Sequence, residues 1–207
     1  MKTSTECLER VIEFYYPPKK ANKIVRCNCQ GSLPNDASFI FVSGARLLTD
    51  SRFRRHTGFP AEGCDAGIYL TTAEGEPIAV CGFDLTPEID ELSGNIAYLS
   101  IRQLKGAKKA VGVKWVKWKR DLLDYHNCWA KSLIQVTEAL AFECGSGVRV
   151  IPARRLPKVI SGILDVKKMV VRYDISAIYR NFEPFPNDNN PKWYIKPWER
   201  IKKELER

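Results

Sequence analysis

The chain has 207 residues, 44% hydrophobic and 28% charged, so it can bury a core of its own and is not intrinsically disordered. No run approaches the roughly 20 apolar residues of a membrane-spanning helix, and the first residues lack a signal-peptide core. We therefore expect no membrane partner, and a cytoplasmic protein whose seven scattered cysteines are free thiols. The net charge of +9 favours nucleic acid, phosphorylated cofactors or acidic surfaces, without choosing among them.

The first 60 residues are expected to form a helix and an extension that pack on a core of residues 61–207. Residues 3–16 have apolar side chains at helical spacing and end at Pro17-Pro18. Cys27 and Cys29 are separated by one residue, which is tighter than the usual zinc knuckle, so no metal site is predicted. A cluster of arginines between residues 46 and 55 is interpreted as a solvated face or an anion-binding surface.

Short runs rich in β-branched and aromatic residues predict four strands in the first half of the chain. Short connections between the last three make an antiparallel meander. The link before the fourth strand is acidic and contains Glu88. The predicted strands are Ser38–Val42, Gly67–Thr72, Pro77–Leu85 and Asn95–Arg102.

A basic loop and a long helix follow the fourth strand. Residues 102–120 contain eight lysine and arginine residues and no acidic residue. Gly106 would let the backbone approach a phosphate, and the start of the helix would favour an anion there. The alternative is that Gly106 only turns the chain and the lysines keep the protein soluble. The helix is predicted from apolar positions at helical spacing, with Gly145 and Gly147 as candidates to end it. These apolar positions are Trp129, Leu133, Val136 and Leu140.

The last sixty residues predict further strands and helices. The expected order is a strand at Val148–Ile151, a helical piece within 156–170, a short helix at Tyr173–Phe182, a loop at Pro184–Pro191, a strand at Trp193–Ile195 and a polar surface helix at Glu199–Arg207. The fold class is therefore α+β, with a mixed, mostly antiparallel central sheet flanked by helices.

In its order of elements, the chain resembles the Gcn5-related N-acetyltransferase superfamily over roughly residues 65–196. The segment from Gln103 to Lys108 resembles the family's Q/R-x-x-G-x-G/A loop at Gln103 and Gly106, and Lys108 departs from it. The helix that ends at Asn181-Phe182 is similar to the family's short helix, which closes on Gly-Phe. The resemblance implies an acyl-CoA N-acyltransferase fold and a loop that binds the CoA pyrophosphate. The cofactor-binding residues would be Ile101, Arg102, Gln103, Leu104, Lys105, Gly106, Ala107, Lys108 and Lys109.

The resemblance also implies transfer of an acyl group, such as acetyl, from an acyl-CoA to an unidentified amine, with no metal. Ala177 stands where the family has its proton-donating tyrosine, so Tyr173 and Tyr179 are the candidate general acids. Asp84 and Glu88 are the candidate general bases. Because neither the acid nor the base is in the family's register, whether the chain is an enzyme stays open.

Two other interpretations remain. The mixture of lysine and tryptophan at residues 114–119 is typical of single-stranded nucleic-acid binding, which would make the protein a non-enzymatic binder. The same mixture also suits the first turns of a helix. The third interpretation is a catalytically inactive acyltransferase fold that acts as a binding module. A nucleophilic pair of Cys128 and His126 is disfavoured because helical residues two apart point away from each other.

Overall fold

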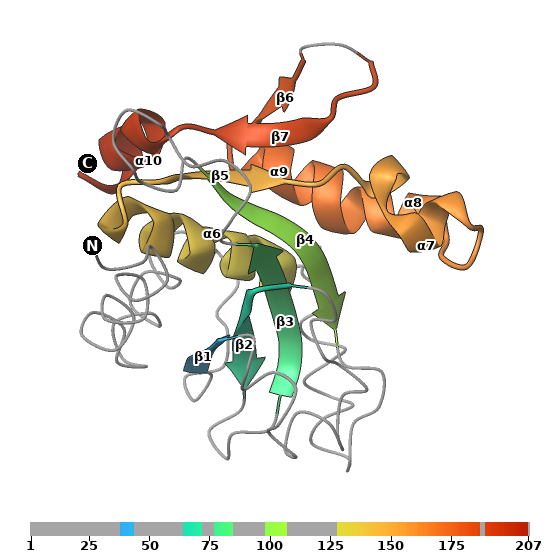
Figure 1. Ribbon diagram of the computed structural model, residues 1–207, viewed down its shortest axis with the longest axis horizontal. Helices are drawn as coiled ribbons and strands as arrows, with labels where there is room; N and C mark the ends of the chain where they lie inside the picture. The colour runs from blue at the N-terminus through green and yellow to red at the C-terminus, as the bar shows by residue number, and fades with distance from the viewer. Residues whose placement is uncertain are drawn as a thin grey trace.

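The computed structural model describes residues 38–43, 64–71, 77–84, 98–106, 128–186 and 189–206. Within them, one sheet has the strand order β1-β2-β3-β4-β5-β7-β6 (Figure 1). Neighbouring strands are antiparallel except β4 and β5, which are parallel. The strands are β1 (Ser38–Ser43), β2 (Ala66–Thr71), β3 (Pro77–Asp84), β4 (Tyr98–Gly106), β5 (Gly147–Val150), β6 (Glu183–Phe185) and β7 (Trp193–Lys196).

The longest described helix packs against the sheet. Helix α6 (Cys128–Glu143) contacts β2, β3, β4 and β5, and also the two helices α9 (Ser176–Tyr179) and α10 (Trp198–Leu205). Each apolar position predicted for this helix is buried in the core with Ile68, Cys81 and Leu99 of the sheet. The predicted α+β class, with its mostly antiparallel sheet and flanking helices, is confirmed.

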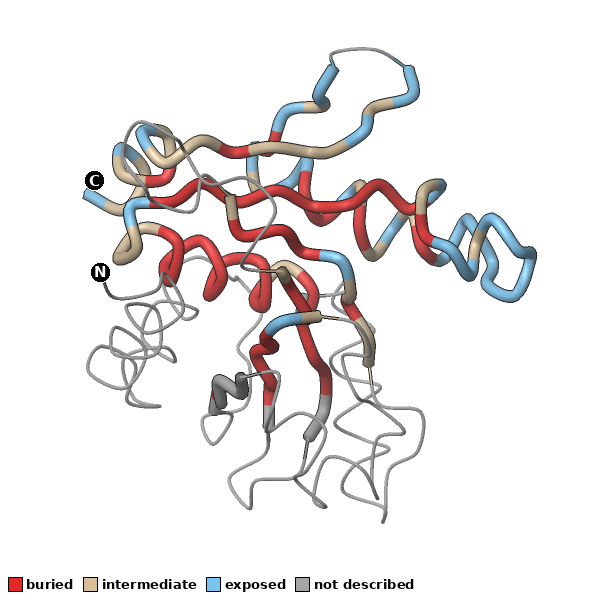
Figure 2. Tube along the Cα trace, in the orientation of Figure 1, coloured by how far each residue is buried: buried red, intermediate tan, exposed pale blue. Residues whose placement is uncertain are grey.

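The chain between β5 and β6 is a series of short helical segments that project beyond the sheet (Figure 1). They are η1 (Ala153–Arg155), α7 (Pro157–Ile160), α8 (Val166–Val170), the π-helical η2 (Val171–Ile175) and α9. The α7–α8 end of this series is largely exposed, whereas α6 is almost entirely buried (Figure 2). Helix α9 ends as predicted on a left-handed Asn181, with φ of 62°, and Phe182 N–H donates to the Ala177 carbonyl at 3.0 Å.

Most predicted elements are confirmed, and two boundaries are wrong. β4 continues to Gly106, although Gln103–Gly106 was predicted to be loop. β6 takes up Pro184 and Phe185, the first two residues of the predicted loop. Helix α10 lies at the surface as predicted, but it buries Ile201. Of the two candidate helix-ending glycines, Gly145 adopts φ of +69°, whereas Gly147 lies in β5, where a Cβ would come within 2.7 Å of the Tyr98 ring.

Strands β4 and β5 run together over a short distance and then part. Tyr98–Ile101 pair with Gly147–Val150, and Ile151 N–H donates to the Ile101 carbonyl at 3.0 Å. Pro152 follows, has no N–H to continue the ladder, and leads into η1. On β4, the register against β3 passes from Ile101–Phe83 to Gln103–Gly82, so Arg102 is the extra residue of a bulge. β4 therefore continues with its β5 side open.

Several predicted features lie outside the described residues. They are the helix at 3–16, the Cys27–Cys29 pair, the arginine cluster at 46–55, Glu88, the segment 107–109 and the lysine–tryptophan segment at 114–119. The division at residue 60 stays a prediction, and β1, which precedes it, pairs with β2 in the common sheet.

Candidate binding site between strands β4 and β5

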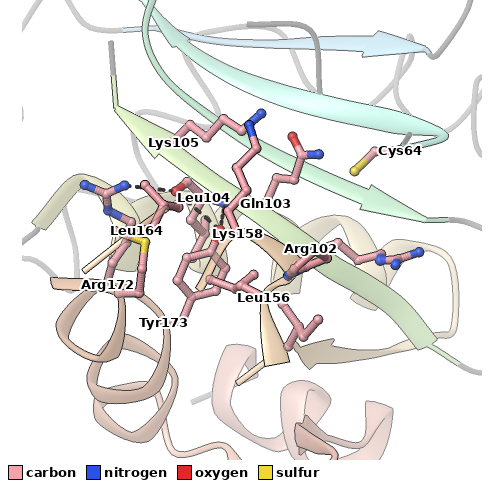
Figure 3. Close-up of a pocket in the computed structure, with 13 residues that line it drawn as sticks. Cys64, Arg102, Gln103, Leu104, Lys105, Leu156, Lys158, Leu164, Arg172 and Tyr173 are labelled. Carbon is pink, nitrogen blue, oxygen red and sulfur yellow. Dashed lines mark hydrogen bonds between the residues drawn. The ribbon is translucent and has the colours of Figure 1, made fainter. Parts of the chain in front are cut away.

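A pocket of about 320 Å³ occupies the place where β4 and β5 part. One wall is the open edge of β4, and the opposite wall comes from the segment between η1 and η2 (Figure 3). The lining combines apolar side chains with four cations, one phenol and one thiol. The lining residues are Cys64, Arg102, Gln103, Leu104, Lys105, Ile151, Leu156, Pro157, Lys158, Leu164, Met169, Arg172 and Tyr173.

Tyr173 covers the open edge of β4. Its hydroxyl accepts a hydrogen bond from Leu104 N–H at 2.6 Å and lies 3.5 Å from the Leu104 carbonyl oxygen (Figure 3). The ring is buried, and burial raises the pKa of Tyr173 well above its usual value, despite the opposing effects of the Leu104 hydrogen bond and of Arg172. The phenol is therefore neutral at physiological pH and takes the place that a neighbouring strand would have.

Arg172 lies next to Tyr173 on the same wall. Its Nη1 donates to the Leu104 carbonyl at 3.4 Å, and its guanidinium carbon lies 5.1 Å from the centre of the Trp129 ring. Its Nε is buried and has no hydrogen-bond partner within the described part of the chain. Burial lowers the pKa of Arg172, but a guanidinium stays charged at neutral pH.

The remaining cations come from both walls. Arg102, the bulge residue, donates from Nη1 to Asp84 Oδ2 at 2.9 Å, and this hydrogen bond raises the pKa of Arg102. Lys105 comes from β4, and Lys158 from α7 on the other side. Burial raises the pKa of the Cys64 thiol to about 12, so the thiolate needed for nucleophilic attack is scarce at neutral pH. The pocket is thus apolar inside and positive around its walls.

The structure separates the predicted catalytic residues. Tyr173 lines the pocket, whereas Tyr179 is 62% exposed, lies under Lys131 Nζ at 3.6 Å and is not part of the lining. Asp84 is joined to the pocket through Arg102. Glu88 lies outside the described residues.

The predicted cofactor segment divides in the same way. The pocket is lined by four of these residues, Arg102, Gln103, Leu104 and Lys105. Ile101 is buried in the core, and a Cβ on Gly106 would meet the Trp129 ring at 3.4 Å. Ala107, Lys108 and Lys109 lie outside the described residues. The part that lines the pocket is a strand rather than the predicted loop, because Leu104–Gly106 pair with Cys81–Ala79 of β3.

The opposite wall was missed from the sequence. Arg172 and Lys158 follow β4 by more than fifty residues, and neither belongs to a motif. The sequence did offer one signal, because Arg172 directly precedes Tyr173, which is a candidate general acid. No group of three or more His, Cys, Asp or Glu side chains that could hold a metal occurs in the described segments. Those segments also contain no helix long and apolar enough to cross a membrane.

Comparison with known proteins gives little beyond this geometry. No protein-family model matches the chain, and no curated protein matches it. One solved structure that matches is a GNAT family N-acetyltransferase (YhbS) from Escherichia coli in complex with CoA, at 14% identity and a TM-score of 0.42. The match covers 79% of this chain and 82% of that chain. Similarity at this level assigns no activity to the chain.

Proposed function

We propose that the β4–β5 pocket binds an acyl-CoA and that the protein transfers the acyl group to an amine. The observation that carries this proposal is the combination of an apolar interior with four cations on the two walls, one of which is the open edge of β4. An acyl-CoA has matching parts, because its thioester and pantetheine arm are weakly polar and its phosphates are anionic. Cationic side chains are typical partners of phosphate groups.

The edge of β4 supplies the group that would activate the thioester. Leu104 N–H points into the gap between the strands, where its present acceptor is the Tyr173 hydroxyl. If that hydroxyl yields the N–H to a thioester carbonyl, the amide stabilises the negative charge that develops on the carbonyl oxygen. The amine nitrogen then bonds to the carbonyl carbon, and the bond from carbon to sulfur breaks.

Tyr173 would act on the departing sulfur. The pKa of a phenol lies above that of a thiol, and burial raises the pKa of Tyr173 further, so its hydroxyl would stabilise the thiolate by a hydrogen bond rather than by giving up its proton. The proton lost by the amine would pass to Asp84 or Glu88, directly or through water, and the CoA thiolate would take up a proton on release. Asp84 is held near the pocket by Arg102.

The first experiment is calorimetric titration of the full chain with acetyl-CoA and CoA at near-physiological salt. We expect saturable micromolar binding, followed by acetyl transfer when amines are screened as acceptors. Binding without transfer to any amine would favour the inactive binding module. Absence of binding to the folded chain would refute the proposal.

A matched pair of variants tests whether the ligand occupies this pocket. Leu164 lines the pocket and is 37% exposed, whereas its neighbour Ile163 is 71% exposed and does not line it. Leu164→Trp should fill part of the cavity and weaken acetyl-CoA binding about tenfold or more, whereas Ile163→Trp should leave it unchanged. Equal affinities in the two variants would show that the ligand binds at another site.

Nucleic-acid binding remains the alternative, and the segments that suggested it lie outside the described residues. It predicts affinity for single- or double-stranded nucleic acid that falls steeply as salt rises, because phosphate contacts release counterions. An affinity that does not change with salt would exclude it.

A further inference from the structure

The side chain of Arg172 carries a positive charge in the pocket wall, and its described contacts do not satisfy all of its hydrogen-bond donors. Its Nη1 makes a long hydrogen bond of 3.4 Å to the Leu104 carbonyl, and its guanidinium packs near the Trp129 ring. Its Nε is buried and has no hydrogen-bond partner among the described residues. A guanidinium binds carboxylate and phosphate best through two parallel N–H groups, and Nε with Nη2 forms one such pair.

Three other cations in the described part of the chain have carboxylate partners. Arg180 donates to Glu138 through two nitrogens, Lys196 reaches Glu138 and Glu204, and Arg102 reaches Asp84. Arg172 makes no ion pair with a carboxylate in the described segments. A charge removed from water is unfavourable unless an opposite charge or hydrogen bonds replace the water. The position of Arg172 is therefore better suited to a pocket that holds an anion than to an empty one.

We propose that Arg172 is an anion anchor inside the pocket, where its guanidinium binds a carboxylate or phosphate group of the ligand. Lys158 on the same wall and Lys105 on β4 add positive charge around that group. The identity of the ligand rests on the proposed function, whereas the inference that Arg172 binds an anionic group does not. If the ligand is an acyl-CoA, the anion is either one of its phosphates or a carboxylate on a dicarboxylic acyl group.

The test compares Arg172→Met with Arg154→Met in the full chain. Arg154 is exposed and does not line the pocket, so its replacement removes the same charge without touching the site. The probes are inorganic pyrophosphate, acetyl-CoA and succinyl-CoA, each titrated by calorimetry. Arg172→Met should weaken binding of the anchored probe about tenfold or more, the range for a charged hydrogen bond, and Arg154→Met should not.

The probes distinguish the two sources of the anion. If Arg172 holds a phosphate, Arg172→Met weakens pyrophosphate, acetyl-CoA and succinyl-CoA by similar factors. If it holds a carboxylate, the wild-type chain binds succinyl-CoA more tightly than acetyl-CoA, and Arg172→Met makes the two affinities equal. Arg172→Lys keeps the charge but loses the two-nitrogen geometry, so it should show part of the same loss. This second variant keeps the test informative if Arg172→Met does not fold.

The remaining outcomes separate this inference from the proposed function. Wild-type affinity for acetyl-CoA in both Arg172 variants, with no gain for succinyl-CoA, overturns the anchor and leaves the proposed function standing. Binding of pyrophosphate but of neither acyl-CoA, lost in Arg172→Met, supports the anchor and refutes the proposed function. If the folded wild-type chain binds none of the three probes, both are overturned.

Discussion

Two regions of this molecule gather charged side chains and use them in opposite ways. Between α6, β7 and α10, the fully buried Lys196 donates to Glu204 at 2.5 Å and lies 3.4 Å from Glu138, which also pairs with Arg180. Around the β4–β5 pocket, Arg172, Lys105 and Lys158 line a cavity, and Arg102 pairs with Asp84 at its edge.

The comparison shows how a cluster of charged side chains can be assigned to structure or to binding. In the first region, positive and negative groups satisfy one another, and Lys196 also donates to the Arg180 carbonyl at 2.8 Å. Such a closed network orients helices and strands but leaves little capacity for a ligand. In the second region, cations face a cavity with few acidic groups, so an anionic ligand would complete the site. The predictions below test this difference, from the largest expected effect to the smallest.

Replacing Lys196 should have the largest effect on stability. Lys196→Met leaves Glu138 and Glu204 without a common partner and should lower the free energy of unfolding by about 3–5 kcal/mol, the range for breaking a buried ion pair. Urea denaturation measures the change. Lys203→Met on the exposed side of α10 is the control and should change stability by less than about 0.5 kcal/mol. Equal losses in the two variants would show that the network is not what stabilises this region.

Tyr173→Phe should have an intermediate effect on stability. The change leaves Leu104 N–H without its acceptor at the strand edge, so unfolding should become easier by about 1–3 kcal/mol. Amide exchange at Leu104, followed by NMR, should become faster. Tyr179→Phe removes the same hydroxyl from an exposed ring and serves as control. Unchanged exchange at Leu104 in Tyr173→Phe would contradict the role given to the hydroxyl.

The pH dependence of stability should reveal the closed network. Burial opposes ionisation of Glu204, but the hydrogen bond and charge of Lys196, with Asn181 and Arg180, outweigh it and hold the pKa of Glu204 below its usual value of 4.5. Its contribution to stability is therefore complete above about pH 4.5 and is lost as the pH falls through the lower, folded-state pKa. Thermal melts of Glu204→Gln should show a weaker acid dependence than wild type. Identical acid dependence would exclude this contribution.

The smallest effect is expected for the reactivity of Cys64, which lines the β4–β5 pocket. Because burial raises the pKa of its thiol to about 12, alkylation by iodoacetamide at neutral pH should be at least about tenfold slower than for a free cysteine. Peptide mapping by mass spectrometry measures the rate at this residue. A ligand in the pocket, which Cys64 lines, should slow the reaction further. Rapid labelling that acetyl-CoA does not affect would contradict both the buried thiol and its place in the site.

Local patterns in the sequence were sufficient for most of the fold. Alternating and β-branched runs predicted β1, β2, β3, β5 and β7, and the spacing of apolar residues predicted α6, because each pattern reflects one face turned toward the core. The end of β4 was missed because Gln103 and Lys105, beside Gly106, look like a polar loop. Pairing with β3 and the bulge at Arg102 keep this segment in the sheet, and neither is encoded within the segment itself.

The sequence by itself determined the α+β class, the order of most elements and a basic segment near β4. Tertiary structure decided which charges are paired and which face a cavity. It placed Tyr173 rather than Tyr179 at the strand edge, and it brought Arg172 to Leu104, 68 positions earlier in the chain. It also buried Lys196 against Glu138 and Glu204. The physical reason is that charge pairing and cavities depend on contacts between distant segments, whereas strands and helices are predicted from the periodicity of neighbouring residues.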